Sequence, residues 1–345
     1  MTVLLIHLIK IACVIGVMLT IVAYTVLAER KVCAWIQDRI GPNRVGPMGL
    51  LQPLADGLKF VFKEDVLPHH VNKVYFTLAP LIAMVPALIT IAVVPWGSQL
   101  VIPGLAEPVK GVIADLNVGI LFVFAVSSLG VYGIVLAGWA SNSKYPFLGG
   151  IRSSAQMISY EVCMGLSVVP IFMHVGSLSL VKVVEYQAQH LPFICYPHLW
   201  LSFFIFVVSA FAETNRLPFD LPEAEQELVG GYHTEYSSMK FAMFFLGEYA
   251  AMFVASALLV TLFFGGWSLP FAPLNAPAQT LGVGLVHIGI FLAKVCCFLF
   301  FYIWVRWTIP RFRYDQLMAL GWKLFIPLTL LNIFITGVVL AVIAK

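Results

Sequence analysis

Charged residues are scarce in this sequence of 345 residues. Only 20 lysines and arginines and 17 aspartates and glutamates are present, or 11% of the chain, whereas soluble domains carry about 25%. Hydrophobic residues make up 61%, and the mean hydropathy is +0.94. This composition excludes a water-soluble globular domain. It predicts an all-α polytopic integral membrane protein, because backbone polar groups inside a bilayer must find their partners within helices.

Metal-binding and redox motifs are also missing. The six cysteines include no C-x-x-C pair, which excludes the usual iron–sulfur and zinc patterns and gives no disulfide framework. His69 and His70 are adjacent but have no further ligand cluster beside them. We therefore expect no metal site, no redox centre and no catalytic residue in this chain, and no nucleic-acid partner.

Eight apolar stretches of roughly twenty residues predict eight transmembrane helices in a single membrane domain, residues 1–345. The fifth stretch is short. The predicted spans are residues 4–28, 74–95, 116–139, 154–175, 198–212, 239–264, 281–305 and 324–344.

Positive charge is distributed unevenly between the connections. The odd connections, together with Lys240 at the edge of the third, hold 15 of the 20 lysines and arginines, and the even ones hold only Lys110 and Lys182. By the positive-inside rule, the odd connections face the cytoplasm and both termini face the other side of the membrane. These predicted cytoplasmic loops are residues 29–73, 140–153, 213–238 and 306–323.

The first cytoplasmic loop contains a predicted amphipathic helix over Leu50–Glu64. At about 100° per residue, its polar side chains share a narrow sector opposite the apolar ones. Such a helix lies in the membrane interface with its apolar face in the lipid. The polar side chains are Gln52, Asp56, Lys59 and Lys63.

Two interpretations of this helix remain open. It is a simple surface anchor, or it borders an entrance for a lipid-soluble molecule with a polar head. Glu29 and Arg30 at the end of the first span, with Trp35 and Arg39 close behind, favour the entrance, because arginine and tryptophan donors can orient carbonyl oxygens.

The third cytoplasmic loop and its flanks, residues 212–249, are unusually acidic. Seven of the 17 acids lie here, opposed only by Arg216 and Lys240. Each carboxylate raises the pKa of its neighbours, so the protons leave in coupled steps, and next to a membrane this predicts a proton-storing group. The alternative is a solvated acidic loop. The acids are Glu213, Asp220, Glu223, Glu225, Glu227, Glu235 and Glu248.

Glu161 and Glu248 lie within predicted spans. An intramembrane acid costs at least about 2.5 kcal/mol and usually faces a partner or a wet cavity, although a protonated, merely tolerated side chain is the alternative. Lys294 also lies within a span, where it pairs with a buried acid or reaches an aqueous path. The basic last loop either carries positive-inside charge or docks an acidic partner.

Four motifs resemble the H subunits of bacterial respiratory complex I, the counterparts of mitochondrial NADH dehydrogenase subunit 1. The resemblance covers essentially the whole chain, and its first two motifs are long. They are E-R-K-x₇-R-I-G-P-N-R-V-G-P-x-G-L-L-Q-P-L-A-D-G-L-K at Glu29–Lys59, A-E-T-N-R-x-P-F-D-L-P-E-A-E-x-E-L-V-x-G at Ala212–Gly231, F-F-L-x-E-Y at Phe244–Tyr249 and P-R-F-R-Y-D-Q-L-M at Pro310–Met318.

The resemblance implies roles for individual residues. Glu29, Arg30, Arg39, Asp56 and Arg216 are similar to residues around a quinone entry path, to which our own interpretation adds Trp35. A buried charged route that carries the coupling to proton translocation is implied for Glu161, Glu213, Glu223, Glu225, Glu227 and Glu248.

The family also implies cofactors and partners. The substrate is a quinone, with ubiquinone expected, while FMN and iron–sulfur clusters belong to other subunits. The partners are peripheral-arm subunits, antiporter-like membrane subunits and lipid, and the chain alone is expected to be inactive. Two alternatives remain: a homologous membrane protein of an energy-converting hydrogenase complex, or a stand-alone ion transporter, for which the sequence shows none of the usual internal repeats.

Overall fold

The structure is a computed structural model, which describes residues 2–103, 107–221, 229–269 and 275–343. Over these residues its regular secondary structure is helical except for one short antiparallel hairpin, in which β1 (Gln99–Leu100) pairs with β2 (Val109–Lys110). The longer helices are α1 (Thr2–Ile36), α3 (Lys73–Thr90), α5 (Leu129–Ala140), α6 (Lys144–Val175), α8 (Trp200–Glu213), α10 (Ser238–Phe263), α11 (Leu281–Thr308) and α13 (Ile326–Ile343). The shorter ones are α2 (Gln52–Phe62), α4 (Gly119–Ser127), α7 (Leu180–Gln189) and α12 (Tyr314–Ala319), with single turns at Pro47–Gly49, Ile91–Val93, Phe193–Cys195, Pro197–Leu199 and Gly231–His233.

Seven of the described helical segments are long and apolar enough to cross a membrane, with α4 and α5 counted as one and α12 to α13 as another. This confirms the prediction of an all-α polytopic membrane protein. The remaining predicted span, 198–212, corresponds to α8, whose 14 residues extend about 21 Å at 1.5 Å per residue. That is shorter than the hydrocarbon layer of about 30 Å.

Several helices extend beyond the predicted spans. α1 continues to Ile36, and α6 begins at Lys144, ten residues before the predicted start of that span. Hydropathy marks where a segment is apolar, whereas a helix ends only where the backbone is interrupted. At the far end of α6 the interruption is Gly176, whose φ of 69° is the left-handed conformation that ends many helices.

The C-terminal helical segment contains a π-helical turn over Leu320–Phe325, where the sequence predicted part of a loop. Pro327 lacks an N–H and its ring crowds the carbonyl four residues earlier, which favours a wider turn before it. Side chains of α6 bind this region: Tyr160 donates to the carbonyl of Leu317 at 2.9 Å, and Trp322 donates to Ser159 at 3.0 Å.

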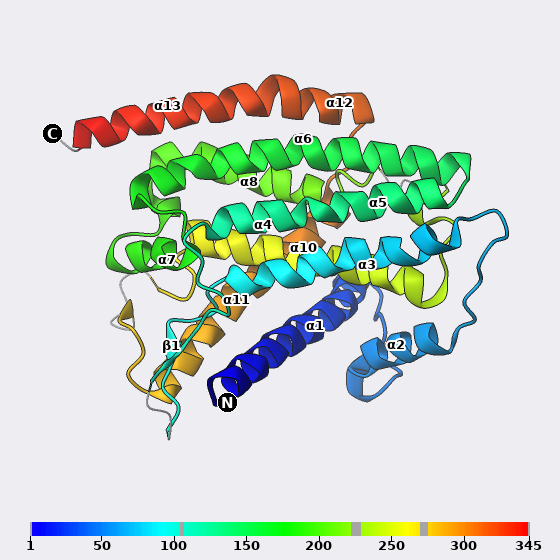
Figure 1. The fold of residues 1–345 in the computed structure, drawn as a ribbon, viewed down its shortest axis with the longest axis horizontal. Coiled ribbons are helices and arrows are strands. Elements are labelled where there is room, and N and C mark those ends of the chain that lie inside the picture. Colours follow the sequence, from blue (N-terminus) through cyan, green and yellow to red (C-terminus); the bar gives the residue numbers. More distant parts are fainter. Residues whose placement is uncertain (1, 104–106, 222–228, 270–274, 344–345) are drawn as a thin grey trace.

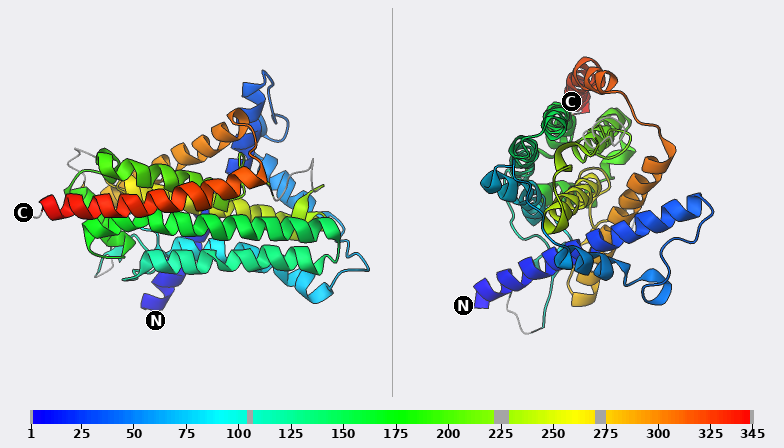
Figure 2. Two further views of the ribbon diagram at one scale, coloured as in Figure 1. Left: turned by 90° about the horizontal axis from the view of Figure 1, so that it is seen from above. Right: turned by 90° about the vertical axis from the view of Figure 1, so that its right-hand side faces the viewer.

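Most of the long helices run roughly parallel, and α1 and α11 cross them obliquely (Figures 1 and 2). α10 lies at the centre and contacts α1, α3, α7, α8 and α11. The amphipathic α2 lies at one end of this bundle, and α7 and the β1–β2 hairpin lie at the opposite end (Figure 1). The largest fully buried side chains include Phe206, Phe253 and Phe291, from α8, α10 and α11.

Close contact between α3 and α5 depends on Gly133. A Cβ atom at this position would lie 2.5 Å from the backbone nitrogen of Ala83 and 2.9 Å from the carbonyl oxygen of Ala79. Both neighbours are backbone atoms of α3, so neither can rotate away. The absent side chain therefore sets the spacing of these two helices.

We expect Gly133→Ala to lower the midpoint of thermal unfolding, because overpacking costs about 1–3 kcal/mol. Gly165→Ala in α6 is the matched control, since its Cβ would meet nothing within 4 Å. There the better helix propensity of alanine should leave stability unchanged or raised by up to about 1 kcal/mol. Thermal unfolding of both variants in detergent would measure the difference, and equal midpoints would contradict the packing argument.

Candidate functional site

The loop that follows α8 is fixed by hydrogen bonds to α6. The buried amide of Gln156 donates to the carbonyls of Ala212 at 2.8 Å and Phe219 at 2.9 Å. Asn215 adopts a positive φ of 50°, which turns the chain back after the helix. Arg216 is thereby directed into the protein, where it is only 6% exposed.

Arg216 joins acids from two different helices. Its guanidinium lies 3.3 Å from the carboxylate of Glu29 in α1 and 2.6 Å from that of Glu248 in α10. It also lies over the ring of Tyr249, 4.1 Å from the centroid. Burial by itself would lower the pKa of Arg216, but Glu248, Tyr249 and Glu29 together raise it above its ordinary value.

Glu29 has two further partners. The hydroxyl of Tyr249 donates to it at 2.7 Å, and Arg306 in the last turn of α11 forms an ion pair with its other oxygen. We call Glu29, Arg216, Glu248, Tyr249 and Arg306 the charge network. It contains two arginines and two glutamates, so it is neutral when both acids are ionised. Removing one member of such a buried group leaves an uncompensated charge, which costs about 3–5 kcal/mol.

Asp220 lies next to the charge network. It pairs with Arg311 at 3.2 Å. Burial raises the pKa of Asp220 above its ordinary value, and the nearby Arg311, Arg306 and Arg216 only partly oppose this. Asp220 therefore gains a proton more readily than an exposed aspartate does.

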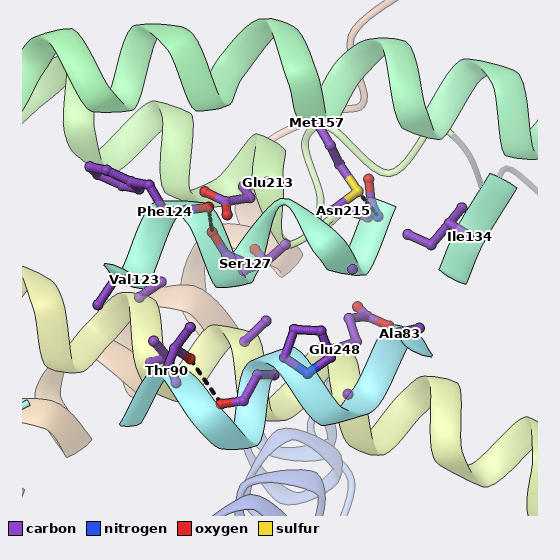
Figure 3. Close-up of a pocket in the computed structure, with 18 of the residues that line it drawn as sticks. Ala83, Thr90, Val123, Phe124, Ser127, Ile134, Met157, Glu213, Asn215 and Glu248 are labelled. Atoms are coloured by element: carbon purple, nitrogen blue, oxygen red, sulfur yellow. Dashed lines mark hydrogen bonds between the residues drawn. The ribbon is translucent and has the colours of Figure 1, made fainter. Parts of the chain in front are cut away.

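A cavity of about 100 Å³ lies beside the charge network, between α3, α4, α5, α6, the end of α8 and α10. Glu213 and Glu248 both line it, and Figure 3 shows them on either side of the space. Ser127 and Thr214 add hydroxyl groups to the otherwise apolar wall. A cavity of this size has room for several water molecules, and two carboxylates line it.

Glu161 in α6 lies within electrostatic range of Glu213. It shares a helix face with Met157 and Met164, which line the cavity. Glu235 is more remote, 3.9 Å from the imidazole of His70. The predicted residues Glu223, Glu225 and Glu227 lie outside the described residues.

The residues predicted for the entry path fall into two groups: Glu29 and Arg216 belong to the charge network, and the other four do not. Arg30 pairs with Asp56 of α2 at 2.6 Å, and Lys59 lies 3.8 Å from the same carboxylate. Trp35, 62% exposed, lies at the C-terminal end of α1. Arg39, in the loop that follows, contacts Gln37. Neither belongs to the charge network.

α2 leaves an apolar face uncovered. Its main helix contacts are with α1 and α10, and none of its residues is buried. Phe62 is 83% exposed and Leu54 is 64% exposed. This matches the predicted amphipathic pattern, with the ion pair to Arg30 on the polar side.

Sequence reasoning did not identify Arg306 and Tyr249 as site residues. Arg306 was assigned to the basic last loop, but the structure places it in α11. An arginine between aromatic residues at the end of an apolar span could have been noticed as an intramembrane charge. Its partner Glu29 is 277 residues away in the sequence, and no local pattern links the two.

Lys294 and three histidines contact neutral groups. Lys294 donates to three backbone carbonyls rather than to an acid. His174 and His198 contact each other at 2.8 Å, and His287 contacts Ser98 at 2.8 Å. Within the described part of the chain, no group of three histidine, cysteine or acidic side chains could hold a metal ion.

Comparison with known proteins gives a consistent result. The sequence model of the NADH dehydrogenase family matches residues 9–337. An NADH-quinone oxidoreductase H subunit of Cytophaga hutchinsonii is 51% identical over 329 residues, which cover 94% of this chain and 93% of the relative. An H subunit of the same oxidoreductase from Geobacter metallireducens is 52% identical, with coverage of 97% and 96%, and its subunit 8 from Rhodothermus marinus is 51% identical, with coverage of 93% of each chain. The chain therefore belongs to the family of H subunits of NADH-quinone oxidoreductase, which are multi-pass membrane proteins.

Proposed function

We propose that this chain forms part of the quinone chamber of respiratory complex I and passes the effect of quinone reduction to proton-translocating subunits. One observation carries the proposal: Arg216 binds Glu29 and Glu248 at once, and Glu248 lines the cavity that it shares with Glu213. Electrons reach the quinone from iron–sulfur centres of partner subunits, and this chain supplies no redox group.

The charge network responds to charge because its members compete for shared partners. Reduction of a quinone consumes protons and changes the charge near the chamber. A change of charge beside Glu29 alters how strongly this acid attracts Arg216, and therefore how strongly the guanidinium is held by Glu248. Such a change passes from the charge network to the cavity that Glu248 shares with Glu213.

The entrance lies between α1 and α2 in this proposal. A quinone tail enters along the exposed apolar face of α2, and Arg30, held by Asp56, offers donors to the head group. The end of the bundle that carries α2 then faces the cytoplasm and the peripheral arm, and both termini lie on the other side.

Two other functions are less well supported. The relatives that match over nearly the full length are named for quinone reduction, which disfavours a hydrogenase-type complex. A stand-alone ion transporter is disfavoured because the relatives that match over nearly the full length are named as oxidoreductase subunits.

We expect Glu213→Gln to lower NADH-driven quinone reduction and proton pumping together, by at least about tenfold. The amide keeps the size of the side chain but cannot exchange a proton, and a positioned proton-transfer group contributes about 10²–10⁴-fold. Glu185→Gln, at an exposed position in α7, is the control and should behave as wild type. Normal activity and pumping in a fully assembled Glu213→Gln enzyme would remove this residue from the coupling route.

Arg306→Gln should destabilise the assembled enzyme by about 1–3 kcal/mol, because it removes one charged partner from the buried Glu29, which keeps Arg216 and Tyr249. Adding Glu29→Gln should recover part of this loss, with an interaction energy of about 0.5–3 kcal/mol. Thermal unfolding of the single and double variants gives that energy. Arg313→Gln, whose side chain is 79% exposed, should change stability by less than about 0.5 kcal/mol, and strictly additive effects of Arg306→Gln and Glu29→Gln would contradict the pairing.

Arg30→Gln should raise the KM for quinone while kcat and the KM for NADH stay near wild type, since it removes a binding group distant from the electron donor. Steady-state kinetics with a short-chain quinone measures this split. Lys63→Gln, exposed just after α2, is the matched control. A fall in kcat at unchanged KM would place Arg30 outside the entry path.

A further inference from the structure

Three carbonyl groups converge on one point just after α10. They belong to Phe264, Gly266 and Ser268, which alternate along the chain. Gly265 and Gly266 adopt positive φ values of 72° and 56°, a conformation that glycine adopts without strain. We call these three carbonyls the carbonyl cup.

The ammonium of Lys294 fills the carbonyl cup. Its Nζ lies 2.7 Å from the carbonyl oxygen of Phe264, 3.0 Å from that of Gly266 and 2.5 Å from that of Ser268. An ammonium has three donors, and all three are used. Lys294 forms no ion pair with any residue that the structure describes, so neutral oxygens alone hold this charge.

The carbonyl cup is built by groups other than Lys294. The amide of Gln187, in α7, accepts from the backbone N–H of Gly265 at 3.0 Å and donates to the carbonyl of Thr261 at 2.9 Å. The hydroxyl of Ser268 donates to the carbonyl of Gly265 at 2.8 Å. These bonds hold the turn that aims the three carbonyls, in addition to the contacts with Lys294.

Neutral carbonyls at these distances suit a monovalent cation. Channels that conduct K⁺ replace its hydration shell with backbone carbonyls, whereas divalent cations are usually bound with carboxylates. The position at the C-terminal end of α10 adds the negative end of the helix dipole. Ammonium is close to K⁺ in size and larger than Na⁺, so a site shaped for one accepts the other.

We propose that the carbonyl cup is a binding site for a monovalent cation of the size of K⁺, and that Lys294 fills it as a tethered cation that stays charged. Lys294 is then a positioning residue, which holds the end of α10, and not a proton carrier. This inference does not rest on the proposed coupling function. It concerns the C-terminal end of α10, whereas the charge network lies near the middle of that helix.

The first experiment replaces the tethered cation in the assembled oxidoreductase. Lys294→Met empties the carbonyl cup, and the purified variant should bind ⁸⁶Rb⁺, a substitute for K⁺, at one site per complex beyond the wild-type level. Its thermal midpoint should be lower than that of wild type in choline buffer and should rise in K⁺ or NH₄⁺ but not in Na⁺. Lys182→Met, an exposed lysine in α7, should show neither effect. A Lys294→Met enzyme as stable as wild type in choline, without added Rb⁺ binding, would overturn the proposal.

The second experiment separates a fixed charge from a proton carrier and also applies if Lys294→Met does not assemble. Arginine cannot be deprotonated in proteins, so Lys294→Arg keeps the charge and abolishes any proton transfer. We expect this variant to assemble and to pump wild-type numbers of protons per NADH oxidised. Normal quinone reduction with pumping lost would identify Lys294 as a proton carrier and refute the positioning role.

Discussion

The buried guanidinium of Arg216 must be paired with acids, and the surrounding helices are arranged to supply them. Arginine stays charged at any physiological pH, and a charge removed from water is tolerated only with partners close by. Arg216 finds them in Glu29 and Glu248, which belong to helices of different tilt. Three features bring these groups together. α1 crosses α10, α11 supplies Arg306, and the sharp turn after α8 directs Arg216 inward. The same requirement brings a carboxylate to the wall of the cavity.

Much of the fold follows from the sequence, because an apolar stretch inside a bilayer must form a helix to satisfy its backbone hydrogen bonds. The helix α2 followed equally directly from the alternation of polar and apolar residues. The intramembrane acids Glu161 and Glu248 could be selected individually because a charge in an apolar helix is expensive. Helix ends were harder, since α1 and α6 continue through residues that are polar yet good helix formers. The pairing of charges could not be predicted, because Arg306, Tyr249 and Arg216 reach Glu29 from three segments far apart in the chain.

Two regions of α10 stabilise positive charge in different ways. Near its middle, the carboxylates of Glu29 and Glu248 balance two arginines. At its C-terminal end, neutral carbonyls hold the ammonium of Lys294, for which the sequence left a buried acid or an aqueous path open. Carbonyl groups are present at every residue, so only the backbone conformation decides which of them converge. The first arrangement depends on which side chains meet, and the second on the turn of the backbone.

The π-helical turn over Leu320–Phe325 has a consequence for the sequence pattern of the last helix. Leu317 before the turn and Thr329 after it are both buried, yet in an unbroken α-helix twelve residues at about 100° each would set them about 120° apart around the axis. A π turn contains roughly one extra residue, which reduces this angle to about 20°. The wide turn thus accommodates one extra residue in the helical repeat. Deleting one residue there would give an ordinary α-helix in which the two buried positions, now eleven residues apart, still lie about 20° apart and face the same side.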